Sequence, residues 1–332
     1  MNVVSPLDSD RWAWDGVARS IADHLGRRAV VLSSRDSAGF ATVAGAQLQD
    51  GVVEATISVA DGRSFHGIVW RLHGCEYESF FVRPHQNGNP DAIQYTPVFN
   101  GVSAWQLYHG EGFWRAVRFP LGEWFTIRVE FEGEAVEVSL AGERVLHTRL
   151  RQVARPGAFG LLVGGENLGV AELRFAEEAV VPAVALPPAD PDAVMAWEVS
   201  EPFSESDIPA VLSHGDRTWT TLEAEPSGLT NLGRAHPLTT EMNTVLVRTT
   251  IESDRARRQP LELGFSDRAV VFLNRDRIFR ADDTYRSRDY RFLGSIGWYD
   301  TLYLPLEAGT NELVVAVTED FGGWGIQARL PR

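Results

Sequence analysis

Alternation of apolar and polar residues dominates the first half of the chain. Between Phe125 and Glu132 the odd positions are apolar and the even positions are polar, which is the pattern of a β-strand with one buried face. Gly133 and Glu134 then predict a hairpin turn, and the alternation resumes from Ala135. These two segments therefore indicate neighbouring antiparallel strands. Further short strands are predicted at residues 52–59, 64–72, 77–83 and 159–164.

The second half of the chain predicts strands of a different kind. Continuous apolar runs bounded by turn residues replace the alternation. Such runs are typical of strands in the middle of a sheet, where both faces are covered. They are found at residues 244–251, 261–265, 269–274 and 312–317.

Only one segment predicts a helix. Val17, Ile21 and Leu25 recur at intervals of four residues and are followed by Gly26, a common residue just beyond a helix end. Elsewhere there is no sustained helical periodicity. Many short strands separated by turns, with so little helix, favour an all-β protein of β-sandwich or jelly-roll domains over an α/β architecture.

Prolines mark a boundary between two domains. Four of them lie between residues 180 and 192, where they remove backbone donors and hold the chain extended. A length of 332 residues also suits two domains better than one or three. We therefore expect two β-sandwich (jelly-roll) domains in tandem, at residues 1–179 and 193–332, joined by a linker at 180–192.

Composition and charge narrow the classes of function. All 31 basic residues are arginine, because the sequence has no lysine, and the 45 acidic residues bring the net charge to −14. Schiff-base catalysis and phosphate loops that depend on lysine are therefore excluded. The negative charge repels nucleic acids and anionic membranes. We expect neither as a partner, and instead a small-molecule or oligosaccharide ligand of little charge.

The sequence predicts no cofactor and no metal site. Cys75 is the single cysteine, so an intrachain disulfide and zinc sites built from several cysteines are impossible. The histidines are scattered without the spacing of metal ligands, and nothing indicates calcium. No apolar stretch reaches the roughly 18 to 20 residues of a membrane span, and no signal-peptide pattern is found. We expect a soluble cytoplasmic protein.

The densest polar and aromatic tract runs from Tyr77 to Tyr108. A neutral sugar offers hydroxyl groups that suit planar polar side chains and C–H faces that pack on aromatic rings. We expect this tract to form the binding site. Alternatively, its polar side chains fasten a long loop and Trp105 fills the core. The candidate hydrogen-bonding residues are Arg83, Gln86, Asp91, Gln94 and Asn100, and the candidate stacking residues are Tyr95, Trp105 and Tyr108.

The same tract contains the candidate catalytic residues. Glu78, His85 and Asp91 could serve as acid, base or nucleophile in hydrolysis or elimination on a glycoside. A glycosidase needs two carboxylates at a fixed separation, which a sequence does not show, so both an enzyme and a binding protein are compatible with the tract. A histidine in a loop beside Arg83 is more often a hydrogen-bonding residue than a general base.

Two features of the second half favour structure over ligand binding. Aspartate and arginine alternate between Asp267 and Arg291, a pattern that normally forms salt-bridged loops. Trp324 is flanked by glycines, which allow a tight turn to place its ring. We expect this indole to pack inside the protein rather than to stack on a ligand.

Residue patterns in both halves resemble known families. The strand-loop-strand pattern of residues 51–175, with its closing pair at 157–163 and 171–175, resembles the concanavalin A-like lectin/glucanase or laminin-G-like sandwiches. Segments 261–267, 271–274 and 304–313 resemble the galactose-binding-like jelly roll, a sugar-binding domain of β-galactosidases. Both folds carry lectins, hydrolases, lyases and interaction modules. The Glu-x-Asp-x-x-Glu strand of laminarinase-type glucanases is absent, so no family catalytic residue is carried over.

Three functions remain after these observations. The tract and the resemblance together predict a lectin-like protein that binds a neutral sugar or a similar polar ligand in its first domain. The first alternative is a glycoside hydrolase or lyase that uses the same pocket. The second is an assembly module whose loops bind another protein, which a large exposed apolar patch would favour.

Overall fold

The protein is all-β in its computed structural model, as the hydrophobic pattern predicts. The structure describes residues 1–213 and 217–331, and of residues 36, 37 and 213 it describes the backbone only. This part of the chain contains 24 β-strands and one α-helix, α1 (Ile208–Ser213). None of its helices is long and apolar enough to span a bilayer. Short 3-10 helices are found at Ser9–Arg11, Pro84–Gln86, Glu205–Asp207 and Leu232–Arg234.

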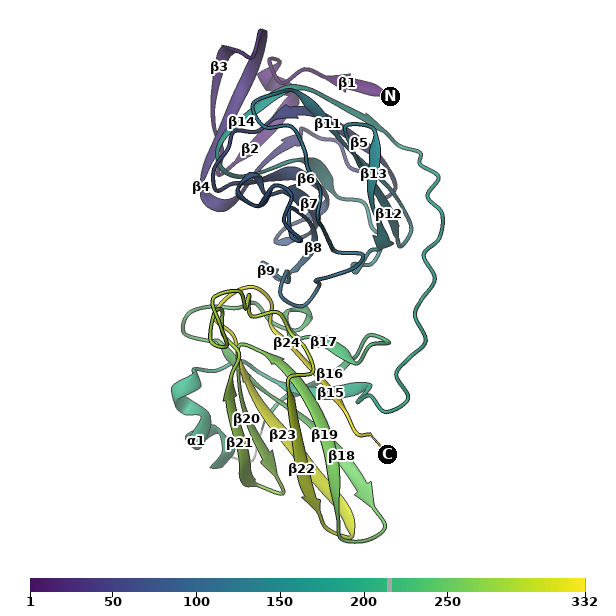
Figure 1. Ribbon diagram of the computed structural model, residues 1–332, viewed down its shortest axis with the longest axis vertical. Helices are drawn as coiled ribbons and strands as arrows, with labels where there is room; N and C mark the ends of the chain where they lie inside the picture. The colour runs from purple at the N-terminus through teal and green to yellow at the C-terminus, as the bar shows by residue number, and fades with distance from the viewer. Residues whose placement is uncertain (214–216, 332) are drawn as a thin grey trace. The chain divides into compact units, whose positions relative to one another are not determined.

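The chain divides into two compact units (Figure 1). The first comprises residues 1–98 and 108–185, and the second comprises residues 99–107 and the chain from 186 onward. The boundary between the two units falls within the proline-rich segment, after residue 185. The expected boundary differs in one respect, because it assigns residues 99–107 to the first domain whereas they pack with the second unit.

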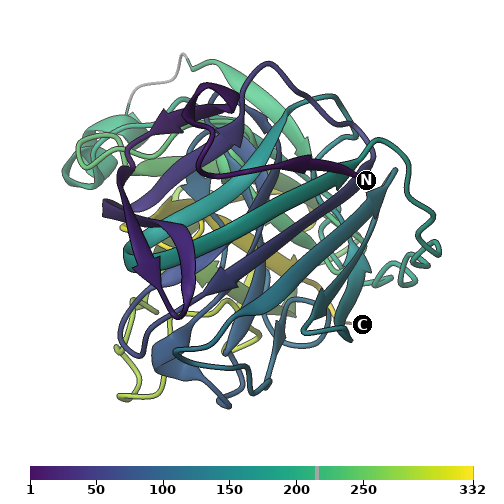
Figure 2. The ribbon, with the colours of Figure 1, turned by 90° about the horizontal axis from the view of Figure 1, so that it is seen from above.

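The first unit is built on a continuous antiparallel sheet, whose long strands run side by side in Figure 2. The main path of this sheet is β10-β8-β7-β6-β14-β5-β11-β12-β13, with β1 to β4 attached through β4 and β14. Its strands are β1 (Asn2–Val4), β2 (Trp12–Asp15), β3 (Ala18–His24), β4 (Arg27–Val43), β5 (Gly51–Ser58), β6 (Phe65–His73), β7 (Glu76–Val82), β8 (Ile93–Phe99), β10 (Trp114–Arg115), β11 (Phe125–Glu132), β12 (Ala135–Leu140), β13 (Glu143–Arg149) and β14 (Ala158–Ala176).

Local sequence explains the central strands of this unit. In β11 the apolar residues Ile127, Val129 and Phe131 are fully buried, and the polar residues between them are partly exposed. The strand turns back through Gly133, whose φ of 55° is costly for residues with a side chain. β14 pairs with β6 along its first part and with β5 along its second. One long strand therefore belongs to two regions of the sheet.

The predicted helix around Ile21 is wrong, because residues 18–24 form strand β3. A spacing of four is an even number, so it places residues on one face of a strand as well as on one face of a helix. The hairpin between β3 and β4 decides between the two. Leu25 and Gly26 have φ values of 46° and 73°, as in the two-residue turns that join antiparallel strands, so Gly26 ends a strand and not a helix.

His66 is a buried histidine in β6. Burial favours the neutral form of its side chain in the folded protein. Its side chain is fully buried, and Nε2 lies 3.1 Å from the backbone oxygen of Glu166. Burial lowers its pKa to about 4, below the ordinary value near 6.5. At pH values between these two, the unfolded chain therefore binds a proton that the folded protein excludes.

We expect the protein to lose stability as the pH falls from 6.5 to 4 because of His66. The loss attributable to this residue is about 3 kcal/mol at most, from the difference between its folded and unfolded pKa. Urea unfolding at pH 7.5 and pH 4.5 would measure it, with His66→Gln as the comparison. The variant should lose less stability than the wild type over this interval, and an identical loss in both would contradict the assignment.

The second unit is a sandwich of two antiparallel sheets. Its core includes Trp197, Leu263, Val315 and Trp324, each of which is at most 1% exposed. The first sheet has the order β16-β15-β18-β23-β20-β21 and the second the order β17-β24-β19-β22. Its strands are β15 (Ala196–Ser200), β16 (Trp219–Glu223), β17 (Leu229–Asn231), β18 (Thr244–Ser253), β19 (Arg257–Ser266), β20 (Arg268–Leu273), β21 (Asp276–Asp282), β22 (Asp300–Leu306), β23 (Gly309–Thr318) and β24 (Gly325–Arg329). The two-residue strand β9 (Val102–Ser103), in the segment 99–107, belongs to neither of these sheets.

The four apolar runs predicted in this half all occupy interior positions of the two sheets. β18, β20 and β23 each have a neighbour on both sides in the first sheet, and β19 lies between β24 and β22 in the second. Interior strands are the ones that need apolar residues along most of their length, because few of their side chains reach solvent. The prediction of central strands is confirmed.

Residues 99–107 are held in the second unit by backbone and side-chain hydrogen bonds. Gln106 donates from its backbone N–H to the oxygen of Gly322 (2.8 Å), accepts from the N–H of Ile296 (3.0 Å) and donates from Nε2 to the oxygen of Leu293 (2.7 Å). Val102 belongs to the core of this unit. The segment is therefore a structural part of the second sandwich.

Candidate functional site

A groove of about 600 Å³ lies in the first unit, between strands β10 and β13. These are the two ends of the main path of the sheet, so the groove runs where the two edges approach each other. It has an apolar side, an aromatic ring and several charged groups, as small-molecule sites commonly do. Its lining residues are Pro90, Gly110, Glu111, Gly112, Trp114, Arg115, Ala116, Arg144, Val145, Leu146 and His147.

Arg115 connects the two edges of the groove. From β10 its Nη1 donates to the backbone oxygen of Val145 at 3.1 Å and to that of Arg144 at 3.4 Å. On β13, Arg144 pairs with Glu137 at 3.2 Å, and His147 Nε2 donates to the backbone oxygen of Pro182 at 2.8 Å. The charge of Arg144 is therefore compensated beside the groove.

Trp114 is half-buried in the wall of the groove. With its side-chain amide turned so that the oxygen faces these donors, Gln94 on the neighbouring strand β8 accepts from Nε1 of Trp114 (3.3 Å) and from Nη1 of Arg83 (3.1 Å). The ring of His109 lies 5.7 Å from that of Trp114 at an angle of 53°. A hydrogen bond on the indole nitrogen and a neighbouring ring fix the orientation of this side chain.

Arg83, which shares the amide oxygen of Gln94 with Trp114, interacts with Asp91. They form an ion pair, and Nη1 of Arg83 also donates to the backbone oxygen of Asp91 at 3.3 Å. Asp91 is only 8% exposed. Of the tract predicted to bind the ligand, Gln94 thus contacts the groove residue Trp114, and Arg83 and Asp91 are linked to it only through Gln94.

Gln86 and His85 lie in the loop that precedes β8 and make structural contacts there. The side-chain oxygen of Gln86 accepts from Nδ2 of Asn89 at 2.7 Å, which fastens the loop to itself. The ring of His85 packs edge-on against Phe65 with centroids 5.4 Å apart. Burial first, and then the positive charges of Arg83 and Arg63, lower the pKa of His85, so this imidazole is neutral at pH 7.

Glu78, Tyr95 and Tyr108 lie in the interior of the first unit. Tyr95 Oη donates to Glu78 at 2.7 Å, and both side chains are fully buried. Glu78 also accepts from the backbone N–H groups of Arg151 (3.1 Å) and Gln152 (2.9 Å). Tyr108 is 2% exposed. A carboxylate with its oxygens occupied cannot reach a substrate, and buried rings cannot stack on a ligand, so these three expected roles are corrected.

Asn100 and Trp105 belong to the second unit. Nδ2 of Asn100 donates to the backbone oxygen of Gly233 at 2.9 Å, and the ring of Trp105 lies 6.1 Å from that of Phe321. None of the eight residues predicted to bind one ligand lines the groove; they are distributed over the loop before β8, strand β8 and residues 100–108. The alternative interpretation, that polar groups of the tract fasten a long loop, fits Arg83, Gln86 and Asp91.

The sequence does not predict the groove residues on β10 and β13 as site residues. β10 has only two residues, too few for a periodic signal, and the partner edge is 30 residues away along the chain. One local signal is present. Gly110 and Gly112, with φ values of 76° and 84°, bracket a turn just before two adjacent aromatic residues, and turns of this kind frequently position binding residues.

Comparisons with known proteins give similarities at the level of structure. No model of a known protein family matches the chain, and no curated protein matches it. It is similar to the carbohydrate-binding module CBM66 from Bacillus subtilis (16% identity, TM-score 0.41, 50% of this chain and 94% of that one). It is also similar to a Bacillus subtilis protein of unknown function with a galectin-like fold (10% identity, TM-score 0.41, 54% of this chain and 94% of that one). A third similar structure is the exoplasmic/lumenal domain of VIP36 bound to Ca²⁺ and Man3GlcNAc (11% identity, TM-score 0.37, 55% of this chain and 93% of that one).

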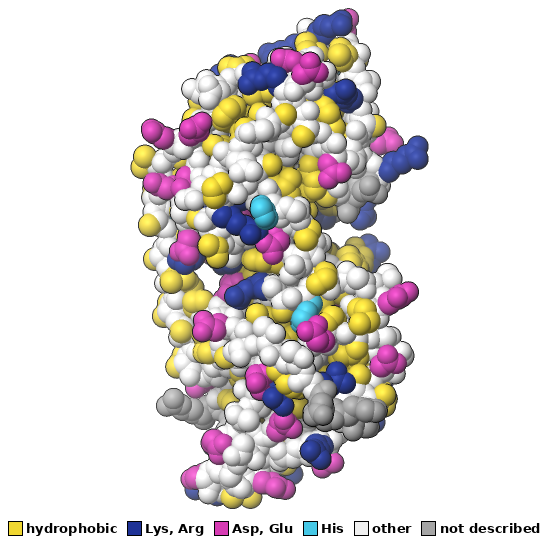
Figure 3. Space-filling model, turned by 180° about the vertical axis from the view of Figure 1, so that it is seen from behind, with side chains coloured by type: hydrophobic (Ala, Val, Ile, Leu, Met, Phe, Trp, Pro, Cys, Tyr) yellow, Lys and Arg dark blue, Asp and Glu magenta, His cyan; other side chains and the backbone are white. Residues whose placement is uncertain are grey.

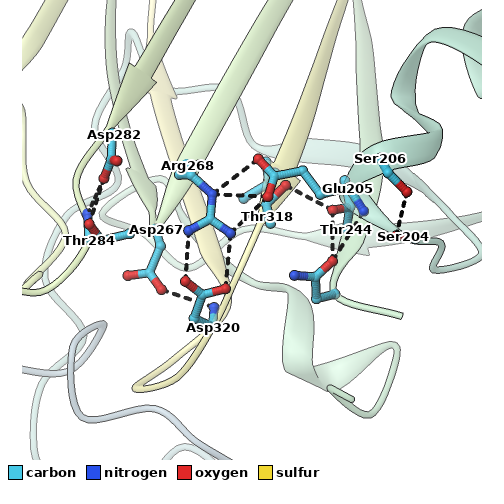
Figure 4. A network of polar contacts seen from close by, with 12 residues as sticks. Ser204, Glu205, Ser206, Thr244, Asp267, Arg268, Asp282, Thr284, Thr318 and Asp320 are labelled. Atoms are coloured by element: carbon cyan, nitrogen blue, oxygen red, sulfur yellow. Dashed lines mark hydrogen bonds and ion pairs between the residues drawn. The ribbon is translucent and has the colours of Figure 1, made fainter. Parts of the chain in front are cut away.

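The charged band of the second unit forms ion pairs, as its alternating sequence predicts. Arg288 pairs with Asp283 (2.6 Å) and Asp300 (3.2 Å). Figure 4 shows the adjoining network, in which Arg268 pairs with both Glu205 (2.9 Å) and Asp320 (2.7 Å). Among the described residues no group of acidic, histidine or cysteine side chains could hold a metal ion. The ion pairs of Arg268 and Arg288 agree with the salt-bridged loops expected for the band.

Trp324 packs inside the second unit, as expected from its flanking glycines. Its side chain is fully buried, and Nε1 donates to the backbone oxygen of Val317 at 3.1 Å. Gly323 has a φ of 136°, and a Cβ at that position would lie 2.9 Å from the backbone of Ala104. Glycine is needed there because the chain passes so close to residues 99–107.

Proposed function

We propose that the protein binds an oligosaccharide of little or no net charge in the groove between β10 and β13. The observation that carries the proposal is the half-buried ring of Trp114, which is held in the groove wall by Gln94 and His109. An aromatic ring that is fixed before the ligand arrives offers a flat apolar surface to the C–H face of a sugar. Because its position is set in advance, binding costs little side-chain entropy.

The charge of the groove supports a ligand without strong charge. Arg115 and Glu111 both line the groove and carry opposite charges, and Arg144 is compensated by Glu137. Figure 3 shows that arginine and acidic side chains are likewise interspersed on the face it presents. Guanidinium, carboxylate and imidazole groups around one ring suit hydroxyl groups, which donate to some and accept from others.

Two of the three candidate catalytic residues have other partners, which weighs against the enzymatic alternative. Glu78 is enclosed, and Asp91 is paired with Arg83. A general acid or base must come within hydrogen-bonding reach of the substrate. The groove itself contains one carboxylate, Glu111, whereas a glycosidase of the usual type needs two. We therefore propose binding without turnover, and the integrity of the bound sugar tests this point.

We expect Trp114→Ala to weaken sugar binding by about tenfold to a hundredfold, which is typical of removing an aromatic anchor from a binding site. The probe is an array of labelled neutral oligosaccharides, followed by titration of the best binder while tryptophan fluorescence is recorded. Mass spectrometry of the recovered sugar should show unchanged masses. New, smaller masses would instead indicate an enzyme.

Trp124→Ala is the matched control for this experiment. Trp124 is also a half-buried tryptophan of the first unit, but its Nε1 donates to the backbone oxygen of Leu25 at 3.2 Å and it does not line the groove. Its replacement should leave the affinity unchanged. Equal affinity of the wild type and Trp114→Ala, with both proteins folded, would refute the groove as the binding site.

A further inference from the structure

Strand β3 has one unpaired edge. It pairs with β4 over its whole length, from Ala18 opposite Ser33 to His24 opposite Arg27, and pairs with no other strand in the described part of the chain. Six of its seven residues are exposed. An exposed strand edge carries a row of free N–H and C=O groups that can pair with another strand.

The side chains of β3 form a symmetric pattern on one face. Arg19, Ile21 and Asp23 alternate along the strand and share that face. Ile21 is 55% exposed, and Leu25 in the following turn is 45% exposed. On an unpaired strand edge, exposed apolar side chains can pack against those of an added strand. The intervals of four that suggest a helix in the sequence therefore describe one face of an unpaired strand.

One register of self-pairing satisfies every residue of this face. When two copies of β3 lie antiparallel with Ile21 opposite Ile21, Arg19 of each copy faces Asp23 of the other. A shift by two residues in either direction places Ile21 opposite a charged side chain. A parallel arrangement in register places Arg19 opposite Arg19. Directly opposed pairs of this kind contribute to sheet stability when their charges differ and destabilise it when they match.

We propose that the protein forms a homodimer through antiparallel pairing of β3 with β3 of a second copy, centred on Ile21. Such an interface is two-fold symmetric and self-complementary, as closed dimers require. It extends the sheet of the first unit from one copy into the next, in the manner of strand addition. A single strand pair buries little area, so the dimer is weak and depends on concentration.

The groups around β3 allow this pairing. The guanidinium of Arg19 stacks on the ring of Trp14, 4.6 Å from its centre, which leaves the N–H groups at its rim available for a carboxylate. Asp23 makes no ion pair or hydrogen bond with the side chains that the structure describes. On β4, Arg28 lies opposite Asp23 and adds a second positive charge near the site of the intermolecular pair.

Charge reversal tests the proposal. Arg19→Asp and Asp23→Arg each turn both attractive pairs of the dimer into repulsive ones, so each should raise the dimer dissociation constant by at least about tenfold. The double variant R19D/D23R again opposes unlike charges and should restore dimerisation to within about threefold of the wild type. Sedimentation equilibrium of the full chain, from about 5 to about 500 µM, measures the constants.

Arg277→Asp is the control for the change in net charge. Arg277 is exposed on β21 of the second unit, and its reversal makes the protein more negative by the same amount as Arg19→Asp. It should dimerise as the wild type does. A monomer at every concentration would overturn the proposal, as would a dimer that persists in Arg19→Asp or fails to return in the double variant. Circular dichroism confirms that each variant is folded.

Discussion

Replacing Glu78 by alanine is expected to destabilise the first unit by about 3 to 5 kcal/mol, the usual cost of removing one partner from a buried charged network. Glu78 is fully buried and accepts hydrogen bonds from Tyr95 and from the backbone of Arg151 and Gln152. Alanine leaves these donors without an acceptor and opens a cavity. It also removes a negative charge that interacts with the buried Arg71, which forms its ion pair with Asp50 at 3.2 Å.

Glu78→Gln separates this structural role from a catalytic one. Glutamine keeps an acceptor for the backbone donors, so a loss of about 1 kcal/mol is expected at acid pH. Burial raises the pKa of Glu78 above its ordinary value, so the folded state holds a proton that the unfolded state releases. The contribution of Glu78 to stability therefore falls as the pH rises through the range between its unfolded and folded pKa, opposite to the contribution of His66, and the variant should lack this part of the pH dependence.

Chemical denaturation of the three proteins at pH 4.5 and pH 7.5 measures both effects. The difference between Glu78→Gln and the wild type should shift in favour of the variant at the higher pH. Sugar binding by Glu78→Gln should remain, because the residue does not line the groove. A glutamine variant of full stability that nevertheless loses an activity on a glycoside would contradict the structural assignment.

Val102→Asp is expected to destabilise the second unit by about 3 kcal/mol or more, because it places a charge in an apolar core. Along the sequence, Val102 lies between strands β8 and β10 of the first unit. In the structure it belongs to the core of the second unit, where it is only 6% exposed. The neighbouring hydrogen bonds of Gln106 to Gly322, Ile296 and Leu293 hold the same segment. A substitution in the first third of the chain should therefore loosen its last third.

Hydrogen exchange followed by mass spectrometry locates this effect. Peptides from β18 and β23 should lose protection in Val102→Asp, whereas peptides from β5 and β11 should keep it. Val153→Asp makes the same chemical change at a position that is 83% exposed and should alter neither set. Loss of protection confined to the first unit would show that residues 99–107 are not part of the second core.

The hydrophobic pattern predicts individual strands well. The alternation between Phe125 and Leu140 gives β11, the turn and β12 with the bounds found in the structure, and the apolar runs give the four interior strands of the second unit. These features are local, because the period of burial along a strand is written in neighbouring residues. The segment at β3 fails for the same reason, since a spacing of four fits both periods.

The candidate site is less accessible to such reasoning. Residue types alone select Gln94, which contacts the groove residue Trp114, but they equally select Tyr95 and Tyr108, which are buried. Chemistry suited to a sugar and chemistry suited to a buried polar network use the same side chains. Whether a tyrosine hydroxyl meets solvent or Glu78 depends on the strands that cover it.

By itself the sequence determines that this protein is all-β, where most of its strands run, that it has no lysine chemistry and that its charge is strongly negative. The tertiary structure decides that β10 approaches β13 to form a groove, that residues 99–107 pack in the second unit, and that Glu78 is enclosed. The reason is physical. Periodicity records which face of an element is apolar, whereas long-range strand pairing decides which elements meet and therefore which side chains remain open to a ligand.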